Sequence, residues 1–222
     1  MLEIKEQTKI SIEKVGNLIK NEMTILPRFS LPYTLEQVKT LILGAYKVIV
    51  ETRGKEFIYD TETENNIIEI AKWLNNPKSS IGLYLCGSVG LGKTNMIVAL
   101  QSLIRVVCGN DSHFEDNELR IVSAVRLCEY ARNNIELYNK YKKCKLLAID
   151  DLGAEPAEIK DFGNVFYPIA DIMDYRYQEQ KFTIITTNMP ADEIRKRYGL
   201  RISDRFKEMF TKVWFKNKKS YR

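Results

Sequence analysis

The chain has 222 residues, 45% of them apolar and 28% charged, which is the composition of a globular protein, and its net charge of +5 permits contact with nucleic acid without requiring it. No 18 consecutive residues are apolar and the N-terminus lacks a continuous apolar segment, so we expect neither a membrane span nor a signal peptide, and a cytoplasmic location. The four cysteines are scattered singly and the single histidine has no cysteine near it, which excludes a structural zinc site of the usual kind.

Residues 1–64 are predicted to form a helical N-terminal region that binds a partner. Apolar side chains recur at helical spacing between Ile4 and Ile19 and again between Leu35 and Val50, and prolines interrupt the pattern between these two stretches. Gly54 is a candidate end for the second helix. The apolar face of this helix can pack either on the chain's own core or on another protein.

Residues 65–222 are predicted to form an α/β domain with a parallel five-stranded sheet. Short apolar runs alternate with helical patterns along this part of the chain, which is typical of βαβ units covered by helices on both faces. The strand candidates are Ile81–Cys86, Leu119–Ser123, Lys145–Asp150, Phe182–Thr187 and Lys212–Phe215.

A phosphate-binding loop follows the first strand candidate. Its residues match G-x-x-x-x-G-K-[ST] and are Gly87, Ser88, Val89, Gly90, Leu91, Gly92, Lys93 and Thr94. A strand precedes the motif and a helical pattern follows it, which is the setting in which backbone N–H groups and a helix N-terminus surround a phosphate. We expect Lys93 to reach the β- and γ-phosphates of ATP and Thr94 to ligate Mg²⁺.

Two carboxylates end the third strand candidate. Asp150 and Asp151 follow the apolar run Leu146–Ile149, and ligands of open α/β sheets bind beyond the carboxyl ends of the strands. We expect Asp150 to hold the Mg²⁺ shell and Asp151 to orient the attacking water. An Asp-Asp pair also begins ordinary turns, so it is the upstream phosphate loop that favours the catalytic interpretation.

A polar tip also ends the fourth strand candidate. Asn188 follows Thr186 and Thr187 there, and its amide could bond the attacking water or the γ-phosphate. The alternative is an ordinary turn asparagine before Met189-Pro190. The local sequence does not decide between these two roles.

In this order, the phosphate loop, the Asp-Asp strand and the Thr-Thr-Asn strand resemble the AAA+ ATPases. Within them, the chain is most similar to the DnaC/IstB-like group of helicase loaders and transposition ATPases. The segments that carry the resemblance are Gly87–Thr94, Leu146–Glu155, Asp174–Tyr177 and Gly199–Phe206. The resemblance covers residues 65–222 and implies an AAA+ domain without a C-terminal lid.

The resemblance also implies roles for several residues. Asp150 and Asp151 match the Walker B pair, and Asn188 matches the first sensor. Arg205, with Arg201 as the second choice, matches the arginine finger that a neighbouring subunit supplies, so a homo-oligomer is expected when ATP is bound.

The function implied is an ATPase, slow without its partner, that loads a replicative helicase and contacts single-stranded DNA. An IstB-like helper of a transposase is the alternative with the same site, and a P-loop kinase or a slow nucleotide-gated adaptor is the alternative of another class. Mixed basic and aromatic side chains suit a single strand. The candidates for this contact are Arg126, Tyr130, Arg132, Tyr138, Lys140, Tyr141, Lys142, Lys143 and the C-terminal lysines.

Overall fold

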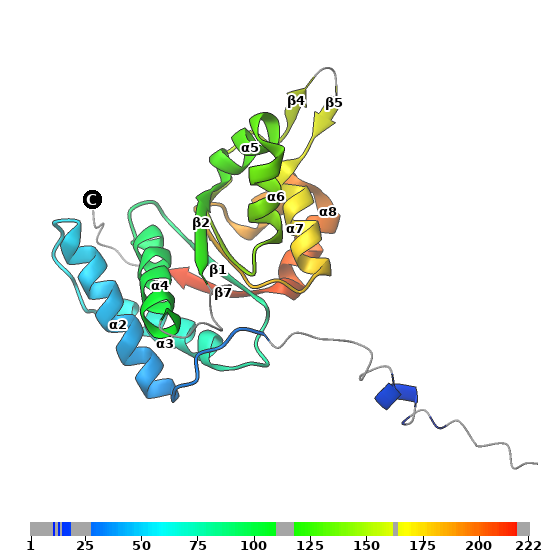
Figure 1. Cartoon of the computed structure of the whole chain (residues 1–222). Helices are drawn as coiled ribbons and strands as arrows, with labels where there is room; N and C mark the ends of the chain where they lie inside the picture. Colours follow the sequence, from blue (N-terminus) through cyan, green and yellow to red (C-terminus); the bar gives the residue numbers. More distant parts are fainter. Residues whose placement is uncertain are drawn as a thin grey trace, which may run out of the picture.

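A parallel five-stranded sheet forms the centre of the computed structural model (Figure 1), which describes residues 11, 13, 15–18, 28–109, 118–161 and 164–216. The strand order is β2-β3-β6-β1-β7. The strands are β1 (Gly82–Gly87), β2 (Leu119–Ser123), β3 (Leu146–Leu152), β6 (Thr183–Thr187) and β7 (Phe210–Phe215). All four neighbouring pairs run parallel. The predicted α/β class and the five-stranded sheet are therefore confirmed.

The burial of each strand follows from its place in the sheet. Every residue of β1 and β6 is buried, as expected for central parallel strands that helices cover on both faces. The edge strands β2 and β7 are partly exposed. In β6 the polar residues Thr183, Thr186 and Thr187 are buried as well, so burial there reflects the central place of the strand and not apolar sequence alone.

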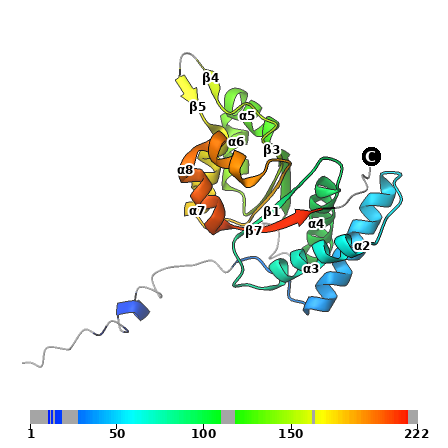
Figure 2. The same cartoon turned by 180° about the vertical axis from the view of Figure 1, so that it is seen from behind.

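Helices cover both faces of the sheet (Figures 1 and 2). Those on one face are α2 (Leu35–Thr52), α3 (Thr61–Asn75) and α4 (Lys93–Cys108), and those on the other are α5 (Ala124–Asn133), α6 (Ile135–Lys143), α7 (Pro168–Gln178) and α8 (Ala191–Met209). Each face has its own hydrophobic cluster. In the part of the chain that the structure describes, none of the helices has the length and apolar character needed to cross a membrane.

Helix α2 packs on the chain's own core. Its buried residues Val38, Ile42, Tyr46 and Val50 belong to the same cluster as the buried side chains of α4. A capping box at Thr34 begins the helix, with reciprocal bonds between Thr34 and Gln37. The division of the chain at residue 64 and a partner-binding role for residues 1–64 stay predictions, and most of the first predicted helix lies outside the described residues.

Two details of the fold differ from the expected elements. A hairpin of β4 (Ile159–Asp161) and β5 (Asn164–Phe166) follows β3 and projects from the domain (Figure 1). In addition, α8 runs from Ala191 to Met209 as one element with a kink inside it, at Gly199, where φ is 84°. Glycine adopts this left-handed conformation at little cost, so two helical segments join there.

Candidate functional site

The strand ends that the motifs occupy meet at one edge of the sheet, around a cavity of about 580 Å³. Because parallel strands end at the same edge, the tips of β1, β3 and β6 are brought together there. The residues that line the cavity are Arg53, Lys55, Val89, Gly90, Leu91, Gly92, Lys93, Thr94, Asn95, Asp151, Leu152, Gly153, Ala154, Asn188 and Met189. This volume lies within the range of small-molecule sites.

The phosphate loop bends through two left-handed glycines. Gly90 has a φ of 85° and Gly92 a φ of 86°, and Gly92 is the N-cap of α4. A side chain would strain the backbone at both positions. Predicted loop residues Val89 to Thr94 line the cavity, while Gly87 and Ser88 lie just before them. The loop therefore presents its backbone and the positive end of α4 to the cavity, an arrangement suited to an anion.

Lys93 is buried at the centre of this loop, with only 5% of its surface exposed. Its ammonium donates hydrogen bonds of 2.8 Å each to the carbonyls of Gly87 and Ser88 and to Oδ1 of Asn188. Burial lowers the pKa of Lys93, and the nearby carboxylates of Asp151 and Asp150 oppose this shift. The predicted loop lysine and the predicted polar tip of β6 thus lie in direct contact.

Thr94 and Asp150 also meet. The Thr94 hydroxyl lies 3.1 and 3.2 Å from the two carboxylate oxygens of Asp150, and Thr186 donates a 2.5 Å hydrogen bond to one of them. Hard oxygen donors of this kind suit Mg²⁺, which proteins commonly hold through one or two carboxylates together with substrate phosphates. Among the described residues there is no cluster of three or more His, Cys, Asp or Glu side chains that could hold a metal ion without such phosphates.

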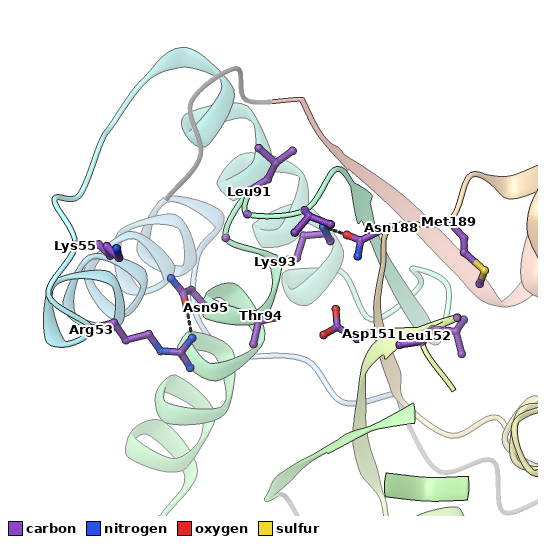
Figure 3. A pocket seen from close by; sticks show the side chains of 15 residues that line it. Arg53, Lys55, Leu91, Lys93, Thr94, Asn95, Asp151, Leu152, Asn188 and Met189 are labelled. Atoms are coloured by element: carbon purple, nitrogen blue, oxygen red, sulfur yellow. Dashed lines mark hydrogen bonds between the residues drawn. The ribbon is translucent and has the colours of Figure 1, made fainter. Parts of the chain in front are cut away.

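Asp151 lies on an irregular turn of the backbone. The register between β3 and β6 shifts between Ile149 and Leu152, and Asp151 has a φ of 54°. Its N–H donates to the hydroxyl of Thr186 at 2.9 Å. A β-bulge re-aims a side chain, and aspartate tolerates the left-handed region better than most residues. The bulge directs Asp151 into the cavity, beside Asn188 (Figure 3).

The loop after Asp151 is fastened to α8 by a buried carboxylate. Glu155 is 2% exposed and accepts hydrogen bonds from the N–H of Gly153 at 2.7 Å and from the Arg197 guanidinium at 3.3 Å. The Tyr198 hydroxyl also donates to it, and burial together with this bond raises the pKa of Tyr198. The cavity wall and α8 are therefore joined by polar contacts to the buried carboxylate of Glu155.

The two candidate finger arginines lie outside the cavity. Arg201 and Arg205 are on the second half of α8, and both pair with Asp174 of α7. The Arg205 side chain is mostly buried and lies 4.9 Å from the ring centre of Tyr177, whereas the Arg201 side chain is 69% exposed. Neither arginine lines the cavity of its own chain.

Three contributors to the site are not predicted by the sequence. Thr186 orients both aspartates, and it lies two residues before Asn188, the residue predicted to be functional on that strand. Arg53 and Lys55 line the cavity from the end of α2 and the turn that follows it. No local pattern marks them, because their place depends on how α2 packs on α4.

The structure also bears on the candidate DNA contacts. Tyr138 is 1% exposed and its hydroxyl bonds the carbonyl of Pro168 and the carboxylate of Asp171, so it is a core residue with a pKa raised by burial. Tyr141 stacks on Tyr130 with ring centres 5.8 Å apart. Lys142 pairs with Asp171. Of the C-terminal lysines, those after residue 216 lie outside the described residues.

Comparison with known proteins supports the fold. No protein-family model matches the chain. The structure superposes on the DnaC helicase loader with a TM-score of 0.56, 22% identity and coverage of 77% of this chain and 98% of that one. The corresponding values for DnaI are 0.50, 21%, 89% and 95%. The predicted resemblance is thus confirmed in the architecture: the chain has the α/β fold of these two proteins.

A curated relative is the chromosomal replication initiator protein DnaA of Nautilia profundicola. It is 23% identical over 231 aligned positions, which take in 94% of this chain. The chain spans about half the length of this relative, since the match covers 50% of it.

Proposed function

We propose that the chain is an ATP-dependent DNA replication factor of the helicase-loader type. One observation carries the proposal: residues predicted from three separate motifs lie together at one edge of the sheet. There Lys93 contacts Asn188, and Thr94 contacts Asp150. The likeness in fold to the DnaC helicase loader and to DnaI supports the choice of client.

In the proposed reaction, water attacks the γ-phosphate in line with the leaving ADP. Lys93 and the loop N–H groups offset the charge that develops on the phosphate oxygens. Asp151 orients the water, and Asn188 holds Lys93 and the γ-phosphate in register. Thr94 and Asp150 would hold Mg²⁺, which when bound neutralises phosphate charge.

Arginines from a neighbouring subunit complete the proposed site. Arg201 and Arg205 lie away from their own cavity, so either can act only on the ATP of another copy. This arrangement makes the ATP-bound form a homo-oligomer, in which each site is completed in trans. Arg201 presents the more exposed guanidinium, and Arg205 supports it through their shared partner, Asp174.

Single-stranded DNA and a replicative helicase are the proposed partners. Exposed cations on α5 and α6, among them Arg126, Arg132 and Lys143, suit the backbone of a single strand. The N-terminal region is the proposed site for the helicase.

The test is phosphate release from the purified chain with ATP and Mg²⁺, with and without single-stranded DNA, beside the Lys93→Ala variant. We expect slow phosphate release, which single-stranded DNA changes and Lys93→Ala abolishes. We also expect the immobilised chain to retain a replicative helicase. Transfer of phosphate to an acceptor without release would instead indicate a kinase. Recovery of a transposase would indicate a transposition helper.

A further inference from the structure

The cavity has two ends of different chemistry. Figure 3 shows Arg53, Lys55 and Asn95 on one side and Asp151, Asn188 and Met189 on the other, with Thr94 between them. The second end is where the proposed function places the γ-phosphate. The first end carries two cations and, among the described lining residues, no carboxylate.

The cations of the first end are held in place by the way α2 ends. Gly54 has a φ of 70°, its N–H bonds the carbonyl of Glu51 at 2.9 Å, and the N–H of Lys55 bonds the carbonyl of Val50 at 3.3 Å. This is the Schellman pattern of hydrogen bonds, which ends a helix and turns the chain sharply. The turn leaves the flanking residues, Arg53 and Lys55, at the rim of the cavity.

Helix α2 also touches the phosphate loop directly. The guanidinium of Arg53 donates a 2.5 Å hydrogen bond to Oδ1 of Asn95, in the first turn of α4. About two helical turns earlier, the Tyr46 hydroxyl lies 3.5 Å from the carbonyl of Gly92. The C-terminal half of α2 therefore lies against a segment of backbone that lines the cavity.

We propose that Arg53 and Lys55 bind the end of the nucleotide remote from the γ-phosphate, with Arg53 on the α-phosphate and Lys55 beside the ribose and base. This inference rests on the proposed function of the cavity. A triphosphate chain that runs from Asp151 along the phosphate loop places the ribose and base near the start of α4. Asn95 and Arg53 lie there. The planar guanidinium suits a phosphate oxygen pair.

The effect on ADP affinity distinguishes a contact with the remote end of the nucleotide from a contact with the γ-phosphate. ATP and ADP share the α-phosphate, ribose and base, so loss of Arg53 weakens both ligands by the same factor. Loss of a group that contacts the γ-phosphate weakens ATP and leaves ADP unchanged. An equal loss for the two nucleotides is therefore the mark of the proposed contact.

The experiment titrates the full chain with ADP and with a non-hydrolysable ATP analogue. We expect Arg53→Ala to weaken both about tenfold, as for a hydrogen bond to a charged group, and Lys55→Ala to weaken both by a smaller factor. Lys47→Ala is the matched control, because Lys47 is on the same helix, is exposed and pairs with Glu51 of that helix. Circular dichroism checks that each variant is folded.

Arg53 could instead act only by holding Asn95, and a double-mutant cycle distinguishes the two roles. If Arg53 contacts the nucleotide, Arg53→Ala still weakens binding in an Asn95→Ala background. If it only positions Asn95, the second substitution adds nothing and the proposal is overturned.

Failure of this inference and failure of the proposed function give different results. Unchanged affinities in Arg53→Ala, with binding lost in Lys93→Ala, overturn the role of Arg53 alone. Unchanged binding in Lys93→Ala overturns the proposed function and this inference with it.

Discussion

The ammonium of Lys93 lies 2.8 Å from the side-chain oxygen of Asn188, although 95 residues separate them in the chain. The contact joins the phosphate loop to the tip of β6, in the centre of the sheet. We expect Asn188→Ala to leave ADP affinity unchanged and to slow ATP hydrolysis about 100-fold, the size found when one preorganised polar group is removed from an active site. Phosphate release and ADP titration measure the two effects, with the exposed Asn133→Ala as control. An unaltered rate would assign Asn188 to the turn before Pro190.

Asp151→Asn should separate binding from hydrolysis. Asparagine tolerates the left-handed backbone that Asp151 adopts, so the bulge and the melting temperature should be kept. It cannot orient water as a carboxylate does, and we expect hydrolysis to fall by about 10²-fold or more. Asp204→Asn, on the exposed side of α8, is the control. Wild-type turnover in Asp151→Asn would remove this residue from the mechanism.

The two arginines of α8 should differ in their effect on stability. Arg205 is mostly buried against Asp174 and Tyr177, so Arg205→Ala should cost about 1 kcal/mol and lower the melting temperature by roughly 2–4 °C. Arg201→Ala removes an exposed ion pair and should leave the melting temperature unchanged. Thermal unfolding of both variants measures this difference.

The same variants test completion of the site in trans. Arg201→Ala and Asp151→Asn should each hydrolyse ATP slowly alone, and mixing them should restore turnover, because an intact cavity then meets an intact arginine. Additive rates in the mixture, with no gain, would show that the arginine is not supplied by a neighbour.

Thr186→Val should raise the Mg²⁺ concentration needed for hydrolysis. The Thr186 hydroxyl bonds both the Asp150 carboxylate and the N–H of Asp151, and valine keeps the shape without these bonds. Loss of a group that orients a metal ligand typically weakens metal affinity about 10- to 100-fold. Mg²⁺ titrations of phosphate release measure the shift. Thr183→Val, at the other end of β6, is the control that should change stability without changing the Mg²⁺ requirement.

Gly54→Ala tests the turn that places Arg53 and Lys55. An added Cβ meets no atom within 4 Å, so the cost comes only from the φ of 70° and should be about 1 kcal/mol. We expect a small loss of thermal stability together with weaker binding of ADP and ATP. Gly44→Ala is a suitable control, because Gly44 lies inside α2 and is equally open. It should not weaken binding.

The sequence by itself determined the phosphate loop, the strands and the helix pattern around them. Each of these is a local signal: glycines and Lys93-Thr94 at set spacing, or a run of apolar residues such as Leu146–Ile149 that needs cover on both faces. Because parallel strands end at one edge, it also placed Asp150 and Asn188 near the loop. It further predicted that Gly54 ends a helix, and α2 ends at Thr52 with Gly54 in the left-handed conformation.

Only the tertiary structure decided which distant side chains share the cavity. Arg53 reaches it because α2 packs on α4, and Asp151 faces it because β3 bulges against β6. Arg201 and Arg205 do not line it and pair instead with Asp174 of α7, which no spacing in the sequence connects to them. Contacts of this kind depend on packing between elements far apart in the chain, and the periodicity of one element carries no information about which partner it meets.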